Sequence, residues 1–185
     1  HADQVEAEAA RRARASDAHS SRGLSRPRAP AQSSDATGET RAAAVRELEA
    51  VLTLYPSGRD AAQVAYLLGN LRFQSQQYPQ ARAAYELALA QGAPRTLRTL
   101  SRGGLAYTWE AEKNYPKAVE AFKFALEGLG PKDFYYEELL LGLGRTQELG
   151  GQKAEASATY RRAVSELPNS RRLDEIKARL AELGS

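Results

Sequence analysis

The side chains that most often carry catalysis or bind metals are scarce in this chain. It has 185 residues, no cysteine and two histidines, His1 and His19. A histidine-based catalytic triad or metal site needs several such groups held together by a folded scaffold. Both histidines precede the part of the chain that has a regular helical pattern. The absence of cysteine also excludes disulfides and thiolate metal sites. We therefore expect no metal and no histidine-based active site.

Two short motifs could suggest other chemistry, but helix structure explains them better. Glu137 and Glu138 are adjacent, and neighbouring side chains on a helix point about 100° apart. We expect them to form a charged first turn beside a helix N-terminus rather than an acid/base pair. Gly142 and Gly144 lie in a helical pattern, without the strand that precedes a dinucleotide-binding loop. The sequence thus predicts that the protein is not an enzyme and binds no cofactor.

A recurring stripe of small and aromatic residues is the most regular pattern in the chain. Its three copies are Ala81, Tyr85 and Ala88; Ala118, Phe122 and Ala125; and Ala156, Tyr160 and Ala163. A small residue, an aromatic residue four positions later and a small residue three positions after that share one helical face. The stripe returns after about 37 residues, and a period of that size indicates stacked helical hairpins.

Proline and glycine divide the repeating region into predicted helices. Pro56, Gly92 and Pro168 mark helix ends, whereas Pro79 lies in a first turn, where its missing N–H costs nothing. We predict helices over residues 41–55, 60–76, 79–91, 95–113, 116–128, 133–149, 152–166 and 170–183. The predicted fold is all-α: a right-handed α-solenoid of about three hairpins, preceded by a half-repeat and closed by a C-terminal capping helix.

The first and last predicted helices have narrow apolar faces. The inward residues that we expect are Ala44, Leu48 and Val51 in the first helix, and Leu173, Ile176 and Leu180 in the last. We expect Asn169 or Ser170 to cap the last helix. A terminal helix of a stacked array needs one buried face and one solvated face.

The first 40 residues differ from the rest in composition. Residues 1–18 are rich in Ala, Arg and Glu and favour a helix, whereas residues 19–40 have few large apolar side chains and favour a flexible linker. The predicted domains are therefore 1–18, 19–40, the repeats over 41–168, and the capping helix over 169–185. The chain also lacks methionine, so we expect the natural protein to begin before His1.

The charge and hydropathy of the chain limit its partners. The net charge is +3, and the arginines of the tail are balanced by acidic residues, without aromatic side chains for stacking on bases. One Arg-Gly-Gly triplet at residues 102–104 is not an array. We therefore do not expect nucleic acid as a partner. No apolar run approaches the roughly 20 residues that cross a bilayer, so membrane association would require an anchor before His1.

The repeating region resembles the tetratricopeptide repeat. The residues that match are Leu68, Gly69, Ala81, Tyr85, Ala88 and Pro94; Leu105, Ala106, Trp109, Ala118, Phe122, Ala125 and Pro131; and Leu143, Gly144, Ala156, Tyr160, Ala163 and Pro168. Arg72 and Gln147 depart from the pattern at positions that are usually aromatic. The resemblance implies that Gly69 and Gly144 let paired helices approach closely, and that the aromatic residue of each copy fills the gap toward the next hairpin.

The same resemblance implies a concave groove lined by the first helix of each hairpin. Carried over to this chain, the groove positions are Gln63, Tyr66, Asn70 and Phe73; Gly103, Tyr107 and Glu110; and Glu138, Leu141, Arg145 and Glu148. Tyrosine suits such a surface because it offers contact area and a hydroxyl group at low entropic cost. Of the positions that grip the C-terminus of a chaperone in some family members, only Asn70 matches, so we do not expect that activity.

A narrower resemblance concerns the setting. The turns at residues 55–58 and 167–170 and the charged C-terminal helix are similar to bacterial envelope proteins of the Tol-Pal accessory, outer-membrane assembly lipoprotein and ancillary translocon subunit types. We therefore expect a protein-binding scaffold or adaptor in the bacterial periplasm or at its membranes, with the cytoplasm as the alternative compartment. A permanent accessory subunit of a membrane-associated complex, docked through the N-terminal tail and the convex faces, is the alternative function.

Overall fold

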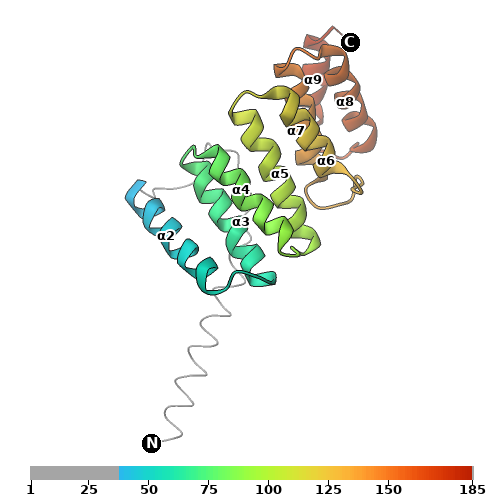
Figure 1. The fold of residues 1–185 in the computed structure, drawn as a ribbon. Helices are drawn as coiled ribbons and strands as arrows, with labels where there is room; N and C mark the ends of the chain where they lie inside the picture. The colour runs from blue at the N-terminus through green and yellow to red at the C-terminus, as the bar shows by residue number, and fades with distance from the viewer. Residues whose placement is uncertain (1–37, 185) are drawn as a thin grey trace, which may run out of the picture. The chain divides into compact units, whose positions relative to one another are not determined.

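The computed structural model describes residues 38–184, which belong to one unit, Asp35–Ser185. These residues form helices joined by short turns, and the described part of the chain contains no strand (Figure 1). The helices are α2 (Gly38–Leu54), α3 (Arg59–Gln74), α4 (Tyr78–Ala90), α5 (Arg95–Ala111), α6 (Tyr115–Leu126), α7 (Tyr136–Leu149), α8 (Lys153–Glu166) and α9 (Leu173–Glu182). The predicted all-α class is confirmed.

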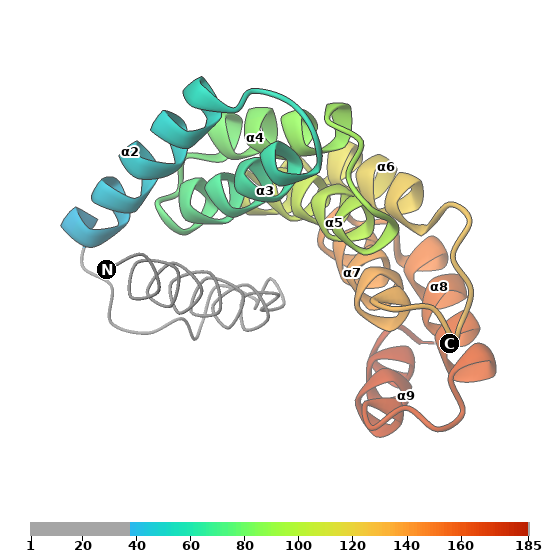
Figure 2. The ribbon, with the colours of Figure 1, turned by 90° about the horizontal axis from the view of Figure 1, so that it is seen from below.

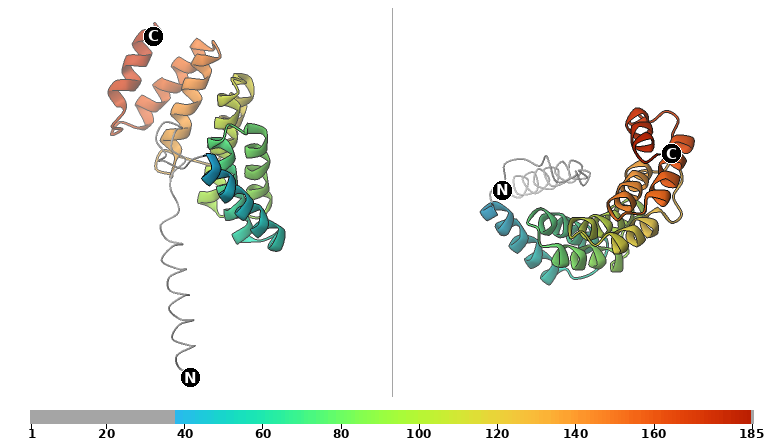
Figure 3. Two further views of the ribbon diagram at one scale, coloured as in Figure 1. Left: turned by 90° about the vertical axis from the view of Figure 1, so that its left-hand side faces the viewer. Right: turned by 90° about the horizontal axis from the view of Figure 1, so that it is seen from above.

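Consecutive helices pack in pairs, and the pairs stack. The hairpins are α3 with α4, α5 with α6, and α7 with α8, and each hairpin contacts the next through α4 and α5 or α6 and α7. Helix α2 packs on α3 as the half-repeat, and α9 packs on α8 as the cap. Within this unit α3, α5 and α7 lie on the inside of a curve, and α4, α6 and α8 lie outside (Figures 2 and 3). This arrangement is the predicted α-solenoid of helical hairpins.

The turn inside each hairpin uses the same backbone conformation. Gln76, Lys113 and Gly151 occupy equivalent places and all have positive φ angles, of 58°, 60° and 78°. The helices that follow the first two of these turns, α4 and α6, have proline as their second residue. Proline tolerates this place because the first N–H groups of a helix have no partner inside it. At α6 the side chain of Asn114 also accepts a hydrogen bond from the backbone N–H of Lys117, at 3.3 Å.

The aromatic residues of the recurring stripe lie in the core, as predicted. Tyr85, Phe122 and Tyr160 are all buried. A β-carbon placed on Gly69 or on Gly104 would lie 2.6 Å from the ring of Tyr85, so this ring is held between α3 and α5. Glycine at these places allows the helices to approach the ring, and the aromatic residue ties one hairpin to the next.

The inward face of the first helix and the start of the last helix differ from the prediction. In α2 the buried face centres on Val45 rather than Ala44, with Leu52 packed against the core, and Val51 is 38% exposed. The last helix begins at Leu173 rather than at 170. Ser170 lies before it, and the hydroxyl of Ser170 accepts a hydrogen bond from the backbone N–H of Arg172, at 3.0 Å.

Two predicted helix starts also differ from the structure. Helix α2 begins at Gly38, inside the segment predicted as linker. The helix predicted over 1–18 and the rest of that linker, 19–37, lie outside the described residues. Similarly, α7 begins at Tyr136 rather than at 133, because Tyr135 takes a left-handed conformation and breaks the helical path.

Candidate functional site on the inner face

Tyr66, predicted to line the groove, is a core residue. Its side chain is only 2% exposed, and its ring centre lies 6.0 Å from that of Tyr85. The phase of α3 places Tyr66 on its inward side, but its side chain lies within the packed core. Its role as a contact residue for a partner is therefore corrected to a packing role.

The other predicted residues of α3 remain partly accessible. Gln63, Asn70 and Phe73 are all half-buried. The amide oxygen of Asn70 accepts a hydrogen bond from the hydroxyl of Tyr85, at 2.8 Å. The ring of Phe73 packs edge-on against Tyr78 at the start of α4, with 5.4 Å between ring centres. Asn70 and Phe73 thus contribute contacts within the hairpin, and Gln63 takes part in neither of these contacts.

A tyrosine that the sequence prediction missed fills the middle of the inner face. Gly103 lies on α5, and a β-carbon there would come within 3.1 Å of the ring of Tyr135, a residue of the loop before α7. Burial raises the pKa of both Tyr135 and the neighbouring Tyr107, so both hydroxyls stay protonated. Tyr107 also meets Phe122 edge-on, with 5.1 Å between ring centres. Tyr107 is therefore half-buried: one side packs in the core, and the rest remains accessible on the inner face.

Glu110 and Arg145, both predicted groove residues, pair with each other across the repeats. Arg145 Nη2 donates to Glu110 at 2.8 Å and its Nε donates at 3.2 Å, and the hydroxyl of Thr146 donates to the same carboxylate. Two-pronged pairs of this kind are geometrically specific as well as charge-assisted. The pair ties α5 to α7 and orients the guanidinium group of Arg145, whose side chain is 42% exposed.

A second charged pair ties α7 to the capping helix. Glu148 accepts a hydrogen bond from Arg179 of α9, and the hydroxyl of Tyr160 donates to the same carboxylate at 3.2 Å. Burial, together with the charge of Glu148, raises the pKa of Tyr160 to about 12. From the sequence, the polar face of α9 is expected only to be solvated. A sequence signal for this pair was missed. Glu148 follows Gly144 by four positions, as Glu110 follows Ala106, and in both cases an arginine lies about one repeat further on.

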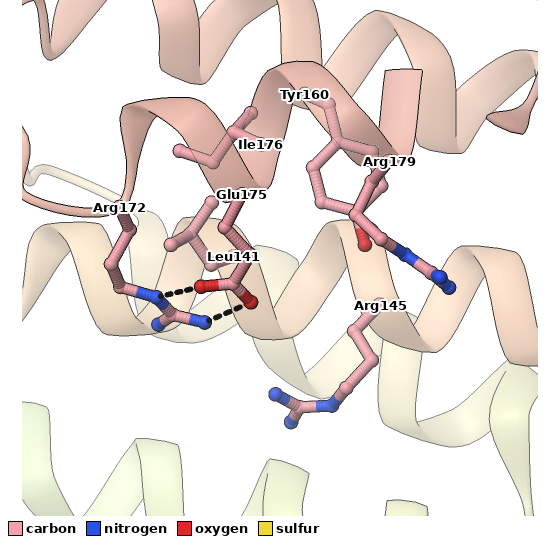
Figure 4. Close-up of a pocket in the computed structure, with 7 residues that line it drawn as sticks. All are labelled: Leu141, Arg145, Tyr160, Arg172, Glu175, Ile176 and Arg179. Carbon is pink, nitrogen blue, oxygen red and sulfur yellow. Dashed lines mark hydrogen bonds and ion pairs between the residues drawn. The ribbon is translucent and has the colours of Figure 1, made fainter. Parts of the chain in front are cut away.

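A pocket of about 300 Å³ opens between α7 and α9, at the C-terminal end of the inner face (Figure 4). Its lining residues are Leu141, Arg145, Tyr160, Arg172, Glu175, Ile176 and Arg179. Two of these, Leu141 and Arg145, were predicted groove positions. The predicted Glu138 lies beside the pocket, with its carboxylate 3.9 Å from Arg172.

The described part of the chain has no residues for a metal site or a membrane span. Residues 38–184 hold no cluster of His, Cys, Asp and Glu that could bind a metal ion. Among the same residues, no helix combines the length and the apolar character that a membrane span requires. The inner face, with its pocket, is thus the candidate site.

Comparisons with known proteins agree with this geometry. A family model of the tetratricopeptide repeat matches residues 138–170, which span the hairpin of α7 and α8. Among solved structures, the Arabidopsis OM64 TPR domain superposes with a TM-score of 0.52 over 66% of this chain and 96% of that chain, at 19% sequence identity. No curated protein matches the sequence. The hairpin of α7 and α8 thus matches the tetratricopeptide-repeat model, and the described helices have the fold of a tetratricopeptide-repeat domain.

Proposed function

We propose that the chain is a non-catalytic scaffold or adaptor that binds a segment of a partner protein along its inner face. The matched repeat and the fold support a protein-binding role in general. The observation that carries the proposal is the row of α3, α5 and α7 along the inside of the curve (Figure 2). Accessible polar side chains remain along that row, from Gln63 on α3 to Glu138 and Arg145 on α7.

The inner face is organised before any partner arrives. Arg145 is oriented by Glu110, and Asn70 by Tyr85. Binding to a preformed surface avoids much of the entropic cost of ordering side chains and loops. A partner segment would therefore spend little of its interaction energy on arranging this protein.

Peptide selection can test the proposal. Peptides displayed on phage would be selected on the wild-type chain, and their affinities measured by fluorescence anisotropy. We expect Gln63→Lys and Glu138→Lys to weaken the selected peptides at least threefold, because they change the charge of the inner face without removing core side chains. Tyr66 is unsuitable for this test, since a buried aromatic residue changed to alanine costs about 3–5 kcal/mol of stability.

Matched controls lie on the outer helix α6. Glu120→Lys and Lys123→Glu change charges of exposed residues there and should leave affinity unchanged. Equal weakening by the controls would refute the assignment to the inner face. A failure to select any peptide that binds would refute the capture of a linear segment.

We also propose the bacterial cell envelope as the setting. The support is the resemblance of the turns at residues 55–58 and 167–170 and of the charged C-terminal helix to envelope proteins of this repeat type. Fractionation of cells that express the full natural protein would test it. Recovery in the periplasmic or membrane fraction is expected, and recovery in the cytoplasm would refute the proposal.

An apolar surface at the end of α2 favours the alternative role of a permanent subunit. Val51, Leu54 and Tyr55 lie close together in the sequence and are 38%, 71% and 67% exposed. Grouped apolar side chains on a surface often mark contacts with another protein. If the chain is such a subunit, Leu54→Glu with Tyr55→Glu should release it from its complex in native extracts. Leu149→Glu, at another exposed leucine, is the control.

A further inference from the structure

The pocket between α7 and α9 combines an apolar wall with paired charges. Leu141 and Ile176 form the wall and are themselves almost fully buried. Its volume, about 300 Å³, is at the lower end of the range for ligand pockets. A space of this size suits one or two side chains of a bound segment rather than a whole cofactor.

The carboxylate of Glu175 already occupies the basic side of this pocket. Arg172 donates to its two oxygens, at 3.0 Å from Nε and 3.2 Å from Nη2. Figure 4 shows the guanidinium groups of Arg172 and Arg145 on the same side as Glu175, while that of Arg179 extends the other way. Hydrogen bonds from Arg172 lower the pKa of Glu175, and the charges of Arg179 and Arg145 act in the same direction.

The bond between Arg172 and Glu175 is local and exposed to solvent. Both residues lie on α9 or at its start, three positions apart, and the Glu175 side chain is 60% exposed. Exposed pairs of this kind contribute little to stability. Arg145, in contrast, is held from outside the pocket by the two-pronged bond to Glu110. An incoming carboxylate could therefore replace Glu175 while Arg145 stays in place.

We propose that this pocket binds an aspartate or glutamate side chain of a partner segment, together with an adjacent apolar side chain, and that Glu175 is displaced on binding. Arg172 and Arg145 receive the partner's carboxylate, and its apolar neighbour lies against the small part of Leu141 and Ile176 that lines the pocket. This proposal rests on the proposed protein-binding function. Because Glu138 lies 3.9 Å from Arg172, the site should favour a single carboxylate over a run of acidic residues.

The test uses the full chain and four labelled peptides of one length, each acetylated, in fluorescence anisotropy at low salt. One peptide carries an internal Leu-Glu pair and an amidated end. The second carries Leu-Gln with an amidated end, and the third carries Leu-Gln with a free C-terminal carboxylate. The fourth replaces the pair and its neighbours with a run of glutamates. We expect the first peptide to bind at least tenfold more tightly than each of the others.

Two substitutions should act in opposite directions on the first peptide. Arg172→Gln should weaken it at least tenfold, and Glu175→Gln should strengthen it at least threefold, since the internal competitor is gone. Glu155→Gln, at an exposed residue of α8, should change nothing. Because residues 172 and 175 are accessible, circular dichroism should report unchanged helicity for both variants.

Several results would overturn the proposal. Equal binding of the Leu-Glu and amidated Leu-Gln peptides would do so, as would a Glu175→Gln variant that binds no better than wild type. Tightest binding of the third peptide would assign the pocket to a chain terminus instead. If phage-selected peptides still bind and still respond to Gln63→Lys, such results refute the pocket and leave the protein-binding function standing.

Discussion

The close contact between Gly142 and Phe122 predicts that adding one methyl group will destabilise the fold. Gly142 lies inside α7, and a β-carbon there would be 2.6 Å from Cε1 and 2.8 Å from Cζ of Phe122. Carbon atoms pack best at about 3.5–4.0 Å, so Gly142→Ala requires a displacement of about 1 Å. Phe122 is 0% exposed and Tyr107 packs against its ring, so the ring has no open space to enter.

Two opposing energies set the expected result. Alanine in place of glycine inside a helix gains about 1 kcal/mol from helix propensity. Overpacking a dense core costs roughly 1–3 kcal/mol. Where the neighbour is a rigid aromatic ring, we expect the upper part of that range. We expect Gly142→Ala to lower the free energy of unfolding by about 1–2 kcal/mol. For a domain of this size, the melting temperature would fall by about 2–8 °C.

Urea unfolding followed by circular dichroism measures this difference, and a double-mutant cycle with Phe122→Leu supplies the control. Leucine leaves space beside α7, so Gly142→Ala should become neutral or stabilising in that background. The coupling between the two sites should reach about 1–3 kcal/mol. A Gly142→Ala protein as stable as the wild type, or a penalty that persists in the Phe122→Leu background, would refute the packing argument.

Two further predictions concern backbone strain and pH. Lys113 has a φ of 60°, and the equivalent turn residue of the third hairpin is Gly151. A left-handed conformation costs a residue with a β-carbon about 1–2 kcal/mol. Lys113→Gly should therefore raise the free energy of unfolding by roughly 0.5–1 kcal/mol in urea titrations. A reciprocal Gly151→Lys change should lower it, and a shift of both variants in one direction would contradict the assignment. Because hydrogen bonds from Arg172 depress the pKa of Glu175 below its ordinary 4.5, the stability this carboxylate adds is complete above pH 4.5 and is lost as the pH falls through the depressed value. Because the pair is exposed, Glu175→Gln should be only slightly less stable than wild type near neutral pH, by at most about 1 kcal/mol in thermal melts, and equal to it in strong acid. A difference of the same size under both conditions would contradict the pairing.

Much of the fold was predictable because its signals are local. Proline and glycine end helices through their own backbone constraints, and the stripe of Ala81, Tyr85 and Ala88 marks a helical face through its spacing alone. Those features need no knowledge of the neighbouring helices. For the same reason the hairpin count, the order of helices and the buried aromatic residues of each repeat agree with the prediction.

The burial of individual residues on the inner face was less predictable. Tyr66 has the spacing of a groove residue, yet its side chain is buried in the core that the stacked helices form. Tyr135 lies in a turn and carries no periodic signal, but the loop brings its ring against Gly103. Helical periodicity reports which way a side chain points from its own helix, and does not report how closely the next helix or loop approaches.

The charged residues of the last helix illustrate the same limit. The sequence alone established α9 as an amphipathic cap with Ile176 on its buried face, because composition and spacing are properties of the segment itself. That Arg172 and Arg179 turn back toward α7 depends on where the stack places α9. Residues of different hairpins become partners only when the hairpins stack, because the contact geometry is a property of the assembled helices.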